Sequence, residues 1–311
     1  MKKIFITLAA VLMTAFAATA QDMSAATETY NNGASFLSNG DFEGALSSFK
    51  SAMTMAEACG EEGAEILTNC KNIIPQILFQ QGKELIKADD YDGALAKLQE
   101  TIATAKEYGN EETATEASEL VPQIKMQKAG SLLNSKNFAE AAAAYEEVLE
   151  GDPTNGTAAL RLGMAYGQLG KIDKAEKAYL DAAANGQDKA AYKQLSSLFV
   201  KAAAGDLKAK KYESAIENAL KSNEYLENPT ALKVAGTAAS QLKKNEDAIT
   251  YLTKYLELSP NAKDASQMAY TIAATAQSIG KKDVAVEYYS KILSDPKYGE
   301  VAKAQIAALK K

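Results

Sequence analysis

Small residues recur along the chain at the start of predicted amphipathic helices, each just after a helix break. Seven alanines hold this position: Ala45, Ala94, Ala141, Ala175, Ala215, Ala248 and Ala285. Their spacings are 49, 47, 34, 40, 33 and 37 residues. Repetition at periods of roughly 20–50 residues is typical of a solenoid, in which stacked units share one continuous core. The pattern therefore predicts an all-α repeat architecture.

The clearest unit covers residues 159–183 and predicts two helices that pack as a hairpin. Gly163 and Tyr166 share one face of the first helix, and Ala175 and Tyr179 share one face of the second. Residues three and four apart lie on one stripe of a helix. The small residues stand where two backbones come close and the tyrosines fill the gaps between units. This packing indicates an antiparallel helix hairpin.

This order of residues closely resembles the tetratricopeptide repeat, a helix–turn–helix unit of about 34 residues. Four units match well. The first three carry the match in Gly33, Phe36, Gly40, Asp41, Phe42, Phe49 and Ala52, then Gly82, Leu85, Asp90, Tyr91 and Leu98, then Ala129, Leu132, Asn137, Phe138, Tyr145 and Pro153. The fourth is the unit described above. The resemblance implies a right-handed superhelical solenoid of about seven hairpins. The tail from Tyr298, with Val301, Ile306 and Leu309 among alanines and lysines, is expected to form a capping helix.

The later units are eroded copies of the same pattern. The fifth keeps Ala203 and Tyr212, and its turn is expected to be one residue short. The sixth keeps Gly236 but has Asn245 in place of the turn aromatic, and the seventh keeps Ala273. No unit carries the tryptophan of the family pattern.

The first two units are longer than the others and repeat each other. Residues 72–77 recur in similar form as residues 119–124, and each segment contains a proline, Pro75 and Pro122. Proline inside a helix removes a hydrogen bond and kinks it. Two interpretations stay open at this point. Either long helices are kinked at the two prolines, or a helix ends and a new one starts there.

The expected division of the chain has four parts. Residues 1–20 are a signal peptide, residues 21–150 hold units with long helices, residues 151–297 hold the shorter units, and residues 298–311 form the capping helix. The most loop-like segment is 151–156, which is either a domain linker or an ordinary connection between units.

The N-terminus has the layout of a secretory signal. Lys2 and Lys3 precede an apolar run of about 14 residues, and Ala18-Thr19-Ala20 closes it as a small-x-small cleavage site. The run is shorter than the roughly 20 residues that span a bilayer. We therefore expect cleavage before Gln21 and export to the periplasm or surface of a bacterium, without stable membrane insertion.

The net charge and the absent residue types exclude several classes of function. Removing residues 1–20 leaves 32 basic and 40 acidic side chains, a net charge of −8, which argues against nucleic acid as a partner. The chain has no histidine and no tryptophan, and Arg161 is its one arginine. Histidine-based triads and metal sites are therefore impossible. The acidic cluster at residues 89–92 fits helix capping better than calcium binding. We expect no enzyme activity, no metal and no cofactor.

Two cysteines, Cys59 and Cys70, lie in a chain whose compartment permits a disulfide. Cys59 ends one predicted helix and Cys70 lies about two turns into the next. That offset is roughly 10 Å, more than the usual Cα separation of about 4.4–6.8 Å. Free thiols are the favoured interpretation, and a disulfide is the alternative.

The resemblance also implies a binding surface. In the family, first helices of successive units line a concave groove that binds extended peptides or partner helices. Carried onto this chain, the groove positions are Tyr30, Asn31, Phe79, Gln80, Lys83, Met126, Gln127, Asn134, Arg161, Met164, Gln168, Lys233, Gln241, Tyr270 and Gln277. Amides can pair with a peptide backbone, and methionine adapts to varied shapes. A clamp for a C-terminal carboxylate is not expected, because Met126, Gly130 and Leu160 hold its positions.

These observations predict a non-catalytic scaffold or adaptor that binds a protein or peptide partner. Two alternatives remain. Tyr30, Phe79 and Tyr270 could stack on the sugar rings of an envelope glycan, or the long N-terminal helices could assemble a homo-oligomer.

Overall fold

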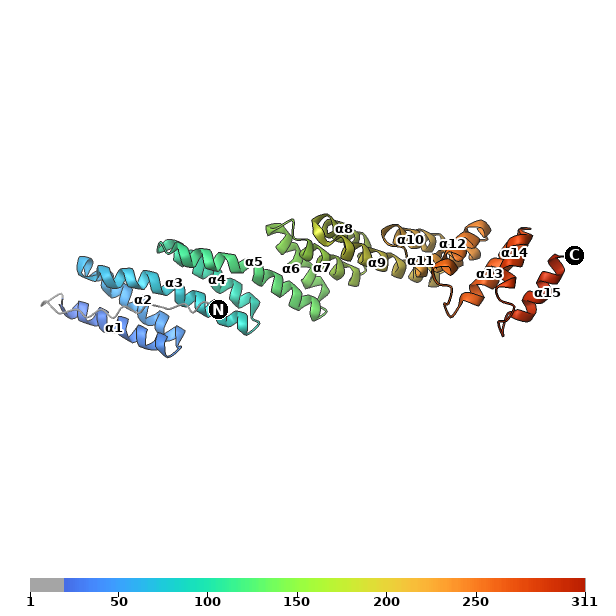
Figure 1. Ribbon diagram of the computed structural model, residues 1–311. Coiled ribbons are helices and arrows are strands. Elements are labelled where there is room, and N and C mark those ends of the chain that lie inside the picture. The colour runs from blue at the N-terminus through green and yellow to red at the C-terminus, as the bar shows by residue number, and fades with distance from the viewer. Residues whose placement is uncertain (1–19, 311) are drawn as a thin grey trace. The chain divides into compact units, whose positions relative to one another are not determined.

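The computed structural model describes residues 20–310 as helices and short connections. They fall into two compact units, unit 1 up to Pro153 and unit 2 from Thr154. Figure 1 labels the helices of each unit. Unit 1 contains α1 (Ala20–Ser38), α2 (Phe42–Ala58), the 3-10 turn η1 (Gly60–Gly63), α3 (Ala64–Lys87), α4 (Tyr91–Glu107), α5 (Glu111–Asn134) and α6 (Phe138–Gly151).

Unit 2 continues the same alternation of first and second helices. It contains α7 (Gly156–Gln168), α8 (Ile172–Ala182), the π turn η2 (Ala183–Gln187), α9 (Asp188–Lys208), α10 (Tyr212–Tyr225), α11 (Pro229–Gln241), α12 (Asn245–Leu258), α13 (Ala265–Ser278), α14 (Lys282–Ser290) and α15 (Gly299–Leu309).

Within residues 20–310 the helices pair into seven consecutive hairpins, from α1–α2 to α13–α14. The seven repeat alanines are all buried, with at most 1% of their surface exposed. The last helix, α15, covers the end of unit 2 by burying Ala302 and packing Ile306 and Leu309 on the core of α13 and α14. The all-α repeat fold and its capping helix are confirmed.

Small residues let the two helices of a hairpin approach each other. A Cβ atom added to Gly163 of α7 would lie 2.5 Å from a ring carbon of Tyr179 in α8. The same atom on Gly236 of α11 would lie 2.6 Å from Leu252 of α12. The pairing of a small residue with a large one, expected from the sequence, therefore lets the two helices of these hairpins pack closely.

Every hairpin turns through one residue with a left-handed backbone. These residues are Gly40, Asp89, Lys136, Gly170, Lys210, Lys243 and Gly280. Each precedes its repeat alanine by five positions, so all seven turns have the same length. The expectation that the fifth turn is one residue short is wrong, because Lys210 adopts the conformation that glycine adopts elsewhere.

The acidic cluster at residues 89–92 serves the second of these turns. A carboxylate oxygen of Asp90 accepts a hydrogen bond from the backbone N–H of Gly93 at 2.9 Å, which caps α4. Asp41 caps α2 in the same way through Gly44. Among residues 20–310, no group of three or more acidic or cysteine side chains is placed to hold a metal ion.

The two prolines of unit 1 lie inside continuous helices. Pro75 is within α3 and Pro122 is within α5, each a helix of 24 residues. Of the two interpretations of the repeated proline segment, long helices are confirmed, and a helix break at proline is wrong.

Both cysteines carry free thiols, as the geometric argument favoured. Cys70 is buried, and this burial raises the pKa of its thiol to about 12. The predicted signal peptide covers residues 1–19, which lie outside the described residues, and Ala20, where α1 begins. In the described part of the chain, no helix combines the length and the apolar character needed to cross a membrane.

Candidate functional site

The structure buries two of the aromatic residues assigned to the first-helix groove. Tyr30 is 3% exposed and packs edge-on against Phe49, with ring centroids 5.1 Å apart. Phe79 is 5% exposed, and the Lys83 ammonium lies 3.8 Å from its ring centroid. Their assignment to a binding groove is wrong, because both rings belong to the core of unit 1. For the same reason, Tyr30 and Phe79 are not exposed for stacking on the sugar rings of a glycan.

Other members of the predicted set are engaged within the chain. Lys233 forms an ion pair with Asp264 at 3.1 Å, and Tyr255 donates a hydrogen bond to the same carboxylate at 2.5 Å. Burial alone would raise the pKa of Asp264, but the hydrogen bonds from Tyr255 and Lys233 lower it overall. Lys233 is therefore part of a structural contact between α11 and the start of α13.

Two further predicted positions make side-chain contacts of the same kind. Tyr270 stacks on Tyr298 with ring centroids 5.1 Å apart. Gln80 donates a hydrogen bond to Glu84 one turn away at 3.2 Å. A partner at either position would have to displace these contacts.

The remaining positions are mostly exposed on first helices and stay predictions. Those in unit 1 are Asn31, Gln127 and Asn134, and those in unit 2 are Arg161, Met164, Gln168 and Gln241. Met126 is half-buried, and Gln277 is held by hydrogen bonds with Tyr289 and Gln305.

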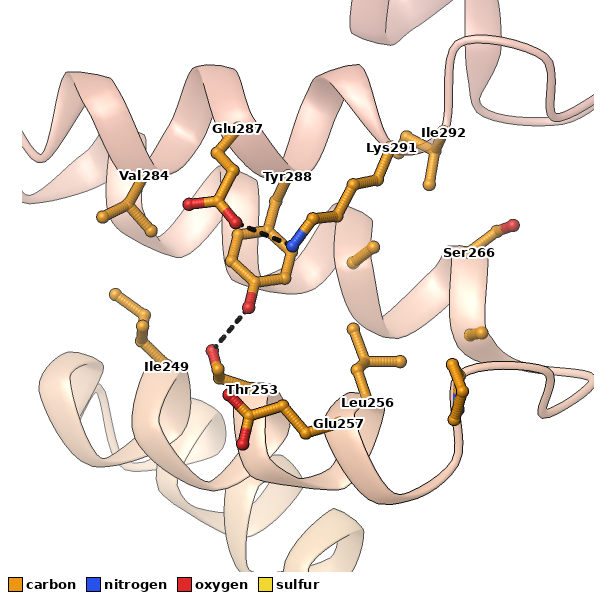
Figure 2. A pocket seen from close by; sticks show the side chains of 13 residues that line it. Ile249, Thr253, Leu256, Glu257, Ser266, Val284, Glu287, Tyr288, Lys291 and Ile292 are labelled. Atoms are coloured by element: carbon orange, nitrogen blue, oxygen red, sulfur yellow. Dashed lines mark hydrogen bonds and ion pairs between the residues drawn. The ribbon is translucent and has the colours of Figure 1, made fainter.

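A cleft of about 700 Å³ lies instead between the second helices α12 and α14, with α13 contributing to it. We call it the α12–α14 cleft. Figure 2 shows its two walls facing each other. It is lined by Ile249, Thr253, Leu256, Glu257, Pro260, Ala265, Ser266, Ala269, Val284, Glu287, Tyr288, Lys291 and Ile292. None of the predicted groove residues is among them.

Tyr288 fixes the polar side of the cleft. Its ring is 6% exposed, and its hydroxyl donates a hydrogen bond across to Thr253 of α12 at 3.0 Å. The Lys291 ammonium lies 4.0 Å from the centroid of the same ring. Because the ring is held from both sides, this part of the cleft is formed before any partner binds.

Three charged side chains line the cleft: Glu257, Glu287 and Lys291. Lys291 forms an ion pair with Glu287 at 2.7 Å. The hydrogen bond to Glu287 raises the pKa of Lys291, burial opposes this shift, and the charge of Glu257 adds to it. Lys291 is therefore protonated at neutral pH and pairs with one carboxylate while a second lies nearby.

Sequence reasoning missed this cleft because it searched the first helices. The second helices gave no specific signal either. Ile249 follows its repeat alanine directly and is half-buried, but the corresponding residue is apolar in every other second helix except α8, where it is Glu176. This position therefore does not distinguish α12 from the other second helices. The distance between α12 and α14 cannot be obtained from such a pattern.

Comparison with known proteins supplies the class. Residues 132–198 and residues 202–263 each match a sequence profile described as Tetratricopeptide repeat. Together with the hairpin fold, these matches show a helical-repeat scaffold of the kind that binds other proteins and is typically non-catalytic. The chain therefore contains tetratricopeptide repeats over residues 132–198 and 202–263.

The solved structures to which the chain is similar are distant. A crystal structure of MamA is 19% identical, with coverage of 57% of this chain and 96% of that one and a TM-score of 0.35. YrrB, described as a TPR protein with an unusual peptide-binding site, is 18% identical over 58% and 91%, with a TM-score of 0.34. Pseudomonas aeruginosa pilF is 19% identical over 60% and 91%, with a TM-score of 0.30. No curated protein matches the chain.

Proposed function

We propose that this protein is an exported, non-catalytic scaffold that binds a peptide segment of a partner protein in the α12–α14 cleft. The observation that carries the proposal is the cleft itself, where apolar walls surround a few fixed polar groups. Sites for small ligands and peptide segments have this composition and volumes of roughly 300–1,000 Å³. The repeat family supports a protein partner in general, and we propose the cleft as the site where that partner binds.

The first-helix face is a weaker candidate in this chain. Two of its aromatic residues are in the core, and Lys233, Tyr270 and Gln80 are engaged by neighbouring side chains. Apart from Met164, its exposed members are polar side chains, which lose rotamer entropy on binding and provide little apolar area.

A matched pair of variants on α14 tests the cleft. Val284 lines it, whereas Val286, two residues away on the same helix, does not; both are half-buried. Peptides would be selected on the wild-type protein from a displayed random library and titrated against Val284→Gln and Val286→Gln. We expect Val284→Gln to weaken binding about tenfold, since it removes apolar contact worth about 1.4 kcal/mol. Val286→Gln should bind as the wild type does.

The first-helix face has its own variant. Arg161→Ala with Gln168→Ala removes two exposed polar side chains of α7 at predicted groove positions. If this double variant loses the selected peptides and Val284→Gln keeps them, the family groove is the site and our proposal is wrong.

Export is tested at the N-terminus. We expect the protein recovered from its native cell envelope to begin at Gln21 when its N-terminus is sequenced. Recovery of the full chain from the cytoplasm would contradict the proposed localisation.

A further inference from the structure

We infer that the α12–α14 cleft selects a short peptide segment with one basic side chain set between apolar residues. This inference rests on the proposed function and adds the chemical class of the partner. It commits to a lysine- or arginine-bearing segment, because the cleft has apolar walls and one more carboxylate than ammonium groups.

The charge argument begins with the pairing inside the cleft. The ammonium of Lys291 donates to Glu287, whereas Glu257 is exposed and makes no ion pair or side-chain hydrogen bond with any described residue. Figure 2 shows Glu257 on α12, across the cleft from Glu287 on α14 and from Lys291, the residue that follows α14. At neutral pH the lining therefore carries a net charge of one negative unit. An approaching cation meets a carboxylate that is not already bound in an ion pair.

The same protein shows how a basic side chain is held between two second helices. Lys221 of α10 reaches Glu176 of α8 at 2.8 Å, and its ammonium lies 4.5 Å from the ring centroid of Phe199. Tyr225 donates a second hydrogen bond to the Glu176 carboxylate at 2.5 Å. We call this set (Glu176, Lys221 and Tyr225) the α8–α10 bridge. In this bridge, the chain itself provides the cation, Lys221, that pairs with the Glu176 carboxylate.

The apolar walls define the rest of the segment. Ile249, Leu256 and Val284 are half-buried in the free protein and Ile292 is 3% exposed, so a partner can cover the first three further. A volume of about 700 Å³ holds a few side chains, not a whole helix. A free inorganic cation or a purely acidic peptide would leave these walls uncovered, whereas a basic residue with apolar neighbours uses both features.

The test uses three synthetic peptides of equal length that differ at one central position. Each has leucine and valine on both sides of a central lysine, glutamine or glutamate and carries the same fluorescent label. Fluorescence anisotropy with the full chain gives the dissociation constants. We expect the lysine peptide to bind about threefold more tightly than the glutamine peptide, and the glutamate peptide to bind most weakly, as for an exposed ion pair.

Variants at two acidic positions identify the group responsible. Glu257→Gln should give equal affinities for the lysine and glutamine peptides, and Glu257→Lys should reverse the preference in favour of glutamate. Asp283→Asn makes the same charge change at an exposed position of α14 outside the cleft lining and should keep the wild-type preference. Since both residues are exposed, the melting temperatures should not change.

The outcomes separate the two proposals. If all three peptides bind the wild type equally and Val284→Gln weakens all of them, the cleft binds peptides but the basic preference is wrong. If Asp283→Asn abolishes the preference as fully as Glu257→Gln, the overall negative charge of the protein selects the peptide, and the assignment to Glu257 is overturned. If none of the peptides binds, while library-selected peptides do bind in the cleft, this composition is wrong. If no peptide of either origin binds, the proposed function fails.

Discussion

The α8–α10 bridge and the α12–α14 cleft are two places in unit 2 where successive second helices meet. In the bridge, one carboxylate, that of Glu176, accepts from both Lys221 and Tyr225. In the cleft, the helices are linked by the neutral hydrogen bond from Tyr288 to Thr253, and a cavity lies beside it. The bridge stabilises the helix array, whereas the cleft leaves room for a ligand.

The difference follows from how the second helices are aligned. The bridge joins Glu176, one residue after its repeat alanine, to Lys221, six residues after the next one. The cleft contact joins residues five and three positions after their alanines. The first helix between the bridge partners, α9, has 21 residues, whereas α13 has 14. The longer first helix, α9, therefore coincides with a different register between the second helices on its two sides.

The largest expected effect tests whether the α7–α8 hairpin, which contributes to the bridge, and the α11–α12 hairpin, which contributes to the cleft, are packed equally closely. Gly163→Ala and Gly236→Ala should each lower the free energy of unfolding by about 2 kcal/mol, because the new methyl group overlaps Tyr179 or Leu252. Urea denaturation measures both. Gly82→Ala is the control: its Cβ atom would lie 3.4 Å from Leu98, so the gain in helix propensity should stabilise unit 1 by about 0.5–1 kcal/mol.

A difference of more than about 1 kcal/mol between Gly163→Ala and Gly236→Ala would show that the two hairpins differ in packing. The contrast between the bridge and the cleft would then arise from packing inside the hairpins and not only from the contacts between second helices.

The next prediction compares the two tyrosine hydroxyls. Tyr225→Phe should cost about 2 kcal/mol, because it removes a hydrogen bond to the Glu176 carboxylate. Tyr288→Phe should cost about 1 kcal/mol, because its hydroxyl donates to the neutral Thr253. Unfolding by urea at pH 7 gives both values. Equal losses would mean that the charge of Glu176 adds nothing to the bridge.

A smaller effect concerns alkaline pH. Burial and then the hydrogen bond to Glu176 raise the pKa of Tyr225 above its ordinary value of 10.0. A group with a raised pKa in the folded state contributes stability that is complete below pH 10 and falls as the pH rises further. The urea midpoint of the wild type should therefore decrease between pH 9 and pH 11, and Tyr225→Phe should make that decrease shallower. An unchanged slope in the variant would exclude a role for the bridge in alkaline unfolding.

The smallest effect belongs to the turns. Lys210 and Lys243 have φ angles of 59° and 58°, a conformation that costs residues with a Cβ atom about 1 kcal/mol or more. Lys210→Gly, in the hairpin of the bridge, and Lys243→Gly, in the hairpin of the cleft, should each raise the free energy of unfolding by about 0.5 kcal/mol. Lys208→Gly, in the last helical turn of α9, should lower it by about 1 kcal/mol. Destabilisation by both turn variants would show that the lysine side chains make contacts that the fold requires.

Much of the fold was predictable because each hairpin repeats a local rule. The repeat alanines are buried for the reason that the pattern indicated, and Gly163 approaches Tyr179 as expected. Tyr30 was assigned wrongly although the sequence contained the correction. It lies four residues from both Ala26 and Ala34, and spacing of four places all three on the same buried stripe.

The burial of Phe79 has a different cause. It lies in α3, a long helix between α2 and α4, where Ile74, Ile77 and Leu78 are also buried. Groove positions carried over from units of about 34 residues do not hold in a helix that is covered on several sides. The α12–α14 cleft was beyond sequence reasoning for a related reason, since Thr253 and Tyr288 meet across 35 residues of chain.

The constant distance of five residues between each left-handed turn and its alanine has a practical consequence for protein engineering. Repeat length changes from hairpin to hairpin, yet this segment keeps its length in all seven, so an added residue there would displace a buried alanine from its stripe. The connections between hairpins vary instead: one is a 3-10 turn at Gly60–Gly63, and another is a π turn at Ala183–Gln187. A fluorophore site, an epitope tag or a fused domain should therefore be placed in these variable connections, where residues such as Glu61 and Ala184 are exposed.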